Sequence, residues 1–308
     1  MTFTHILCPV DRSDVSRRAF DYAVSLARWS AARLTVLEVI DVTPPVPTGA
    51  IPDIGLVPDT LREGVREELG GLIAPALAED VAAEVRVEEG PVAPRILDVA
   101  ADQSVDLIVM GTHGRTGVQR LVLGSITEKI VRQARCPVLA IPPGDEHVPS
   151  PDTPFRTILC PTDFSEVSRV AVALASDLAE QAGARLMLMH VIDWPFGNTI
   201  GPDPVTALRE SLLAQAEREL TAQLRPARAG GPAPEVVAEV GQPARQISAL
   251  ALSRSANLIV MGVSGRGAVG LAVLGSTTHR VLREACCPVL TVRHDAAAAA
   301  APTSPRTS

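Results

Sequence analysis

"GTHGRTGVQRLVLGS" occupies residues 111–125, and "GVSGRGAVGLAVLGS" occupies residues 262–276. Few side chains agree between the two stretches, but the glycines fall on one template: a glycine, two residues, a glycine, nine residues and a Gly-Ser pair. Each stretch opens on the last residue of a short apolar run, DLIVMG at 106–111 and NLIVMG at 257–262. A template kept twice in diverged surroundings indicates a backbone that must approach something closely or adopt a conformation that other residues resist.

The rest of the chain repeats as well. HILCPVDRSDVSRRAFDYAVSLA (5–27) matches TILCPTDFSEVSRVAVALASDLA (157–179), and GSITEKIVRQARCPVLAI (124–141) matches GSTTHRVLREACCPVLTV (275–292). The sequence therefore predicts a duplicated domain. We expect one copy at residues 1–144, a polar, proline-rich linker at 145–154, the second copy at 155–294, and a disordered low-complexity tail at 295–308.

Within the first copy, short apolar runs alternate with stretches of helical periodicity. The expected strands are Ile6–Val10, Leu34–Val39, Ala83–Val87, Leu107–Met110 and Val138–Ile141. The expected helices are Asp14–Ala31, capped by Ser13 or Asp14, then Asp59–Ala78, Val92–Ala101 and Ser125–Gln133. This alternation predicts two tandem doubly wound, Rossmann-like α/β domains, each a five-stranded parallel sheet flanked by helices. Fold precedent suggests the strand order 3-2-1-4-5.

Composition excludes several classes of protein. The 308 residues carry a net charge of -7, which disfavours nucleic-acid binding. Lys129 is the only lysine, so the chain has no phosphate-binding loop of the type that requires one. The apolar run at the N-terminus is too short for a signal peptide, and no run is long enough to span a bilayer. We therefore expect a cytoplasmic protein that does not bind membranes.

The predicted strand order brings two motifs together. Asp11 follows strand 1 and Gly111 follows strand 4, and these strands would be neighbours where the order reverses. Gly111 and Gly114 permit positive φ and let the main chain approach a ligand closely. Gly124 and Ser125 would open a helix whose N-terminal N–H groups favour a phosphate. Asp11 would accept a hydrogen bond from a ribose hydroxyl or a base amine.

This combination resembles the universal stress protein family, in its ATP-binding branch, over nearly all of residues 3–294. The resemblance implies an adenine nucleotide (ATP, ADP or AMP) in each half, with Mg²⁺ or Mn²⁺ held through the phosphates. By position, it implies a first site of Asp11, Val39, Met110, Gly111, Gly114, Arg115, Gly124, Ser125 and Ile126. The second site would be Asp163, Val191, Met261, Gly262, Gly265, Arg266, Gly275, Ser276 and Thr277. The two arginines either pair with phosphate or are only solvated.

Several of these residues also have simpler structural interpretations. A single glycine after a strand is a tight turn, but the whole template repeated in register is not explained in this way. Asp11 and Asp163 could cap the following helices, although Ser13 and Ser165 are better placed. His113, whose counterpart is Ser264, is interpreted as a mobile loop histidine. His190 is interpreted as packed within its strand.

No catalytic set is shared by the two halves. We therefore expect a stress-response sensor or adaptor in which nucleotide orders a surface that an unidentified protein partner reads. A weak ATPase or nucleotide-dependent transferase is one alternative, and a nucleotide-free interaction scaffold is another. The edge strands PVLAI and PVLTV predict that the halves form a pseudo-dimer within the chain. A homodimer between chains stays open.

Overall fold

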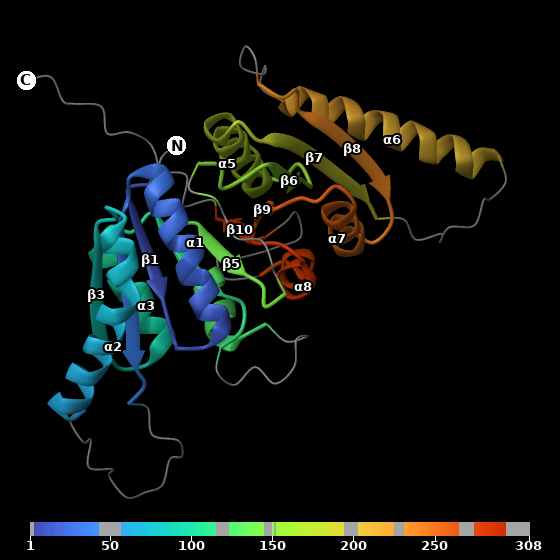
Figure 1. Ribbon diagram of the computed structural model, residues 1–308. Coiled ribbons are helices and arrows are strands. Elements are labelled where there is room, and N and C mark those ends of the chain that lie inside the picture. Colours follow the sequence, from blue (N-terminus) through green and yellow to red (C-terminus); the bar gives the residue numbers. More distant parts are fainter. Residues whose placement is uncertain are drawn as a thin grey trace, which may run out of the picture. The chain divides into compact units, whose positions relative to one another are not determined.

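The computed structural model describes residues 3–42, 57–114, 123–144, 150, 152–193, 203–224, 231–264 and 274–293, without the side chains of 203–205. The chain divides into two compact units, with the boundary near Pro143 and Thr153. Figure 1 colours the first unit from blue to green and the second from yellow-green to red. The predicted tail and residues 145–149 and 151 of the predicted linker lie outside the described residues.

Each unit alternates strands and helices as the sequence predicts (Figure 1). The first unit contains β1 (His5–Pro9), α1 (Asp14–Ser30), β2 (Arg33–Ile40), α2 (Asp59–Ala78), β3 (Ala83–Glu89), α3 (Val92–Asp102), β4 (Leu107–Gly111), α4 (Ser125–Gln133) and β5 (Val138–Ile141). The second contains β6 (Thr157–Pro161), α5 (Glu166–Ala182), β7 (Arg185–Ile192), α6 (Asp203–Gln223), β8 (Glu235–Val240), α7 (Pro243–Ser253), β9 (Leu258–Gly262), α8 (Ser276–Glu284) and β10 (Val289–Val292).

The strand order is β3-β2-β1-β4-β5 in the first unit and β8-β7-β6-β9-β10 in the second. The strands pair in parallel within each unit. The predicted order and the doubly wound α/β fold are therefore confirmed for both halves. The order reverses between β1 and β4, and between β6 and β9, so the C-terminal ends of these strand pairs share one edge of the sheet.

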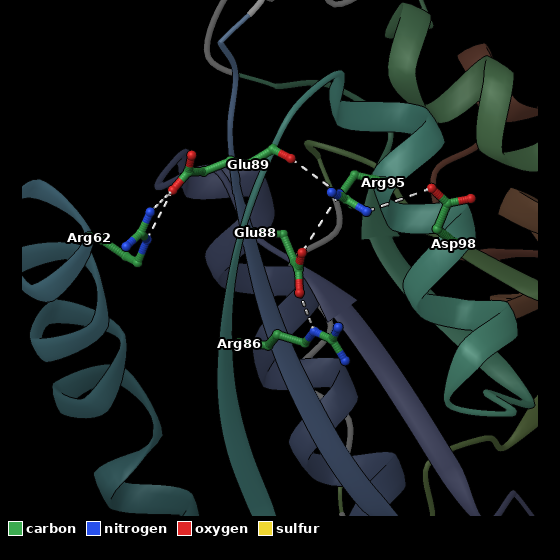
Figure 2. A network of polar contacts seen from close by, with 6 residues as sticks. All are labelled: Arg62, Arg86, Glu88, Glu89, Arg95 and Asp98. Carbon is green, nitrogen blue, oxygen red and sulfur yellow. Dashed lines mark hydrogen bonds and ion pairs between the residues drawn. The ribbon is translucent and has the colours of Figure 1, made fainter. Parts of the chain in front are cut away.

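Helices cover both faces of the first sheet. The ion pair Arg28–Glu79, 2.5 Å long, joins α1 to α2, while α3 packs against α4. Successive side chains of a strand point to opposite faces. Figure 2 shows this at the end of β3, where Glu89 points to Arg62 of α2 and Glu88 points to Arg95 of α3. Because both faces are covered, every residue of β1 and β4 is buried.

Strand β3 runs two residues beyond its predicted end at Val87. Its ladder with β2 continues until Ile40 lies opposite Glu89. Glu88 and Glu89 are poor strand formers by propensity, but the arginines of α2 and α3 compensate their charges. Contacts from outside the strand therefore decide where it ends.

Equivalent serines begin the first helix of each unit. Ser13 caps α1 by accepting a hydrogen bond from the Ser16 amide at 3.1 Å, and Ser165 caps α5 by accepting one from the Ser168 amide at 3.3 Å. Of the two predicted caps, Ser13 is therefore the one used. Ala31, the predicted last residue of the first helix, is the left-handed C-cap at φ 53°.

No helix in the described parts of the chain is long and apolar enough to cross a membrane.

Replacing Ser13 by Ala is expected to lower the free energy of unfolding of the first unit by about 1 kcal/mol, because the helix start loses its cap. Urea unfolding followed by Trp29 fluorescence, with Trp194 changed to Phe, measures this. The control is Ser30→Ala, in which the lost bond to the Leu26 carbonyl lies inside the helix, and its effect should stay within about 0.5 kcal/mol. Equal losses in the two variants would contradict the capping role.

Candidate functional site

Each unit has a pocket at the C-terminal ends of its central strands. The first pocket has a volume of about 590 Å³ and lies in the first unit, and the second pocket has about 570 Å³ and lies in the second unit. Both volumes fall within the range of small-molecule and cofactor sites. The pockets lie where the strand order reverses, which is the usual ligand position in open parallel sheets.

The structure gathers the predicted site residues that it describes around these two pockets. The first pocket is lined by Asp11, Val39, Met110, Gly111, Gly114, Gly124, Ser125 and Ile126. The second pocket is lined by Asp163, Val191, Met261, Gly262, Gly275, Ser276 and Thr277. Arg115, Gly265 and Arg266 lie outside the described residues. That these residues bind a nucleotide stays a prediction.

The two aspartates support the helix caps and do not themselves cap. Oδ1 of Asp11 accepts hydrogen bonds from the amide of Ser13 at 3.1 Å and from its hydroxyl at 2.6 Å. Asp163 accepts the same pair from Ser165 at the same distances. Each carboxylate is therefore held in one orientation at the edge of its pocket, because the following serine is itself fixed to the helix.

Gly111 and Gly114 do not use the positive φ that glycine permits. Among the described residues, the glycines with positive φ are Gly90, Gly183 and Gly241. What requires glycine is close approach. A Cβ on Gly111 would lie 2.7 Å from Cγ1 of Val15, and one on Gly114 would lie 2.6 Å from Oδ2 of Asp11.

The second unit repeats this constraint. A Cβ on Gly262 would lie 2.8 Å from Cγ1 of Val167, the counterpart of Val15. The strand end therefore packs directly against the first helix in both units. Any side chain at this glycine would push the helix and the strand apart.

The end of the glycine template docks helix α4 beside β4. The Gly124 amide donates to the Thr112 carbonyl at 2.9 Å, and Oγ1 of Thr127 donates to the Gly111 carbonyl at 2.8 Å. A Cβ on Gly124 would lie 3.1 Å from the Thr112 carbonyl oxygen. The N-cap of α4 is this glycine, which has no side chain to occupy the first N–H groups of the helix.

Helix α8 is docked beside β9 in the same way. The Gly275 amide donates to the Val263 carbonyl at 2.9 Å, and Oγ1 of Thr278 donates to the Gly262 carbonyl at 2.8 Å. Its N-cap is also a glycine. Each pocket is thus bounded by a helix N-terminus whose positive dipole end favours an anion.

The walls of the two pockets differ next to the aspartates. Arg12 and Phe164 are equivalent residues, and both hold the left-handed conformation, at φ 66° and 63°. Arg12 forms ion pairs with Glu38 at 2.8 Å and Glu68 at 3.2 Å. The ring of Phe164 instead stacks on His190, with ring centroids 4.5 Å apart. The first pocket is therefore lined here by the charged pair Arg12 and Glu38, and the second pocket by His190, with Phe164 behind its ring.

His190 is not packed within its strand as the sequence suggests. It is half-buried and lines the second pocket, and its Nδ1 lies 2.8 Å from the Thr162 carbonyl. Its position near the C-terminal end of β7 places the ring at the pocket rather than in the core. Its counterpart in the first unit is Glu38, which lines the first pocket.

His113 is not an exposed loop histidine either. Its side chain is only 8% exposed, and it lines the first pocket. Nδ1 lies 2.9 Å from Oγ1 of Thr112, and burial lowers the pKa of the imidazole. The expectation of a surface position for this loop histidine was wrong, because the residue is buried at the pocket.

A polar network lies at the end of β3 in the first unit. Figure 2 shows Arg62 of α2 paired with Glu89, whose carbonyl accepts from Arg95 of α3 at 3.1 Å. Glu88 lies between Arg95, at 3.6 Å, and Arg86, at 2.6 Å. The network thus ties α2 and α3 to the end of β3.

Both of those helices contribute apolar side chains to the first pocket, Leu61 and Val65 from α2 and Val92 and Ile96 from α3. In the second unit one uncharged contact takes the place of the arginine contact: Nε2 of Gln246, the counterpart of Arg95, donates to the Val240 carbonyl at 3.0 Å. The backbone arrangement is kept there and the charge is not.

Sequence reasoning missed two kinds of pocket residue. Ser16 and Thr127, with their counterparts Ser168 and Thr278, line the pockets in both halves. Their identity in the two aligned copies is a signal that would have found them. Arg12, Glu38 and His190 gave no such signal, because the copies differ at these positions.

The family model described as the universal stress protein family matches residues 2–142 and 154–293. The chain belongs to this family. A universal stress protein of Mycolicibacterium smegmatis is 31% identical to it over 301 residues, which cover 94% of this chain and 96% of that protein. The tandem arrangement of two universal stress protein domains therefore extends over most of the chain.

Two solved structures are similar to this chain. The crystal structure of a universal stress protein from Archaeoglobus fulgidus has a TM-score of 0.67, with 24% identity, and the match covers 94% of this chain and 98% of that chain. A universal stress protein crystallised in complex with cAMP is 26% identical over 46% of this chain and 98% of that chain, with a TM-score of 0.33. The first of these supports the fold.

Gly111→Ala is expected to destabilise the first unit by about 1 to 3 kcal/mol, because its Cβ would overlap Val15. Urea unfolding measures the loss, and the double variant Gly111→Ala, Val15→Ala should recover part of it. The control is Gly64→Ala in α2, where an added Cβ meets nothing within 4 Å, and this change should stabilise by up to about 1 kcal/mol. Purely additive losses in the double variant would exclude Val15 as the cause.

Proposed function

We propose that the chain binds one adenine nucleotide in each pocket and works as a nucleotide-dependent stress-response sensor or adaptor. Bound nucleotide would order the surface around each pocket, and an unidentified protein partner would read that surface. The observation that carries the proposal is the duplicated pocket, in which an aspartate, close-packed glycines and the N-terminus of a helix converge in both halves.

The phosphate end of the nucleotide is assigned to the glycine template. The N-termini of α4 and α8 supply N–H groups and a favourable dipole, and Ser125 and Ser276 line the pockets at these ends. A side chain at Gly124 would crowd the Thr112 carbonyl and the space above it. Backbone N–H groups at such a position suit the oxygens of a polyphosphate.

The nucleoside end is assigned to the aspartate side of each pocket. The carboxylate of Asp11 is held by Ser13 and can accept a hydrogen bond from a ribose hydroxyl or a base amine. The end of β2 at Val39 offers main-chain groups. Apolar side chains such as Met110 and Ile96 line the same pocket and would contact the faces of a flat base.

The accompanying Mg²⁺ or Mn²⁺ is assigned to the phosphate oxygens. The described residues contain no group of three or more His, Cys, Asp or Glu side chains that could hold a metal ion. Mg²⁺ is commonly bound through substrate phosphates with few protein ligands. Removing the divalent ion is therefore expected to weaken nucleotide binding without unfolding the protein.

Titration calorimetry with Mg-ATP tests the proposal, with cAMP as a second ligand. Wild-type protein should bind about two nucleotides per chain. Asp11→Ala and Asp163→Ala should each weaken one site by roughly tenfold or more, because each removes a charged acceptor. The matched control is Asp102→Ala, which removes an exposed carboxylate at the end of α3.

Unchanged binding in both aspartate variants would show that the nucleotide lies elsewhere. No binding by the wild-type protein of ATP or of cAMP would overturn the proposed function and leave an interaction scaffold. Release of phosphate well above background, lost in the same variants, would replace the sensor with an enzyme.

A further inference from the structure

Two contacts of Thr112 bear on the tautomer of neutral His113. Oγ1 of Thr112 lies 3.2 Å from the Ile141 carbonyl, which can only accept, and 2.9 Å from Nδ1 of His113. When the hydroxyl proton points to the carbonyl, Oγ1 accepts from Nδ1–H. We assign this tautomer, in which Nε2 is left with a lone pair.

Nε2 of His113 is buried and has no hydrogen-bond partner among the residues that the structure describes. The whole residue is 8% exposed and lines the first pocket. A buried polar atom without a partner costs free energy, and such atoms are rare in folded proteins. This atom is therefore a candidate contact for whatever the pocket binds.

The surroundings of His113 favour an anion. The residue stands between Gly111 and Gly114, and a Cβ on Gly124 would lie 3.7 Å from its Cα. Gly124 is the N-cap of α4, a helix of nine residues. The backbone of His113 thus lies beside the N-terminus of α4, where the helix dipole attracts negative charge. A phosphate oxygen cannot accept from a lone pair, so contact with it requires a proton on Nε2.

We propose that His113 is a phosphate-contacting residue of the first pocket that takes up one proton from solution as the nucleotide binds. The inference rests on the nucleotide binding proposed above. The proton adds to the Nε2 lone pair, no other bond is made or broken, and the resulting imidazolium donates to a phosphate oxygen. Ser264, the counterpart in the second pocket, carries a hydroxyl that does not titrate in this range.

The electrostatics set the direction of the pH dependence. Burial lowers the pKa of His113 from its ordinary value, so the ring is neutral in the nucleotide-free pocket near pH 7. A phosphate beside Nε2 raises that pKa. At pH values between the pKa of His113 in the free pocket and its pKa beside the phosphate, the affinity for the nucleotide falls as pH rises, by up to about tenfold per pH unit.

Other charged side chains line the same pocket. They are Asp11 and Arg12 after β1, Glu38 of β2 and Asp41 after it. Asp11 is placed closest to the loop by its contact with the Gly114 position. Its negative charge also favours the imidazolium.

Calorimetry of Mg-ATP binding at pH 7.5 tests the proposal, in buffers of different ionisation enthalpy. The dependence of the observed heat on the buffer gives the number of protons taken up. Wild-type protein should take up roughly one proton more per chain than His113→Gln, in which an amide can donate but does not titrate. Protonation of ATP itself cancels in this difference. The control, His279→Gln on α8, should match the wild type.

The ring proton signals of the histidines provide a second readout. In the wild-type protein, the ring proton signals of a single histidine should titrate with a clearly higher pKa after Mg-ATP is added, and this signal should be absent from spectra of His113→Gln. Binding of ATP with equal proton uptake in wild type and His113→Gln, or no rise in the histidine pKa, would overturn the inference while leaving nucleotide binding intact. Absence of ATP binding would instead overturn the proposed function.

Discussion

The site depends on three glycines, because neighbouring atoms occupy the space that a side chain at each of these positions would need. Val15 packs where a side chain of Gly111 would be, Asp11 lies where one of Gly114 would be, and the Thr112 carbonyl crowds Gly124. This close packing brings the end of β4, the start of α1 and the start of α4 together at one edge of the sheet. Positive φ does not explain why glycine occupies these positions, because none of the three adopts it. The pocket exists because three backbone segments approach more closely than side chains allow.

The two halves keep this backbone arrangement and change what covers it. The same hydrogen bonds occur in both halves at nearly the same distances. They join the capping serine to the aspartate, and a threonine hydroxyl to the carbonyl of the glycine that ends the strand. The walls differ, with an arginine–glutamate pair in one pocket and a histidine, in contact with a phenylalanine, in the other. The two copies therefore share the backbone of the site and differ in the side chains that line it. Two pockets of similar volume can consequently bind related ligands with different affinity and different pH dependence.

The fold could be predicted from the sequence almost completely, because it depends on periodicity and on the repeat. Helices such as Ser125–Gln133 were placed to the residue, and the strand order followed from the doubly wound pattern. Errors arose where contacts distant in sequence decide the outcome. The charges of Glu88 and Glu89 are compensated by arginines of two helices, which extends β3. The burial of His113 depends on loop packing, and the place of His190 on how β7 meets the pocket, and neither leaves a local pattern.

Equilibrium dialysis of the purified chain against increasing Mg-ATP tests the central claim most directly, because it counts bound nucleotide without relying on heat or on a variant. The account predicts saturation at about two nucleotides per chain, one for each pocket. Saturation at one nucleotide per chain would contradict the proposal that both pockets bind a nucleotide. No binding at any concentration would contradict the nucleotide site itself.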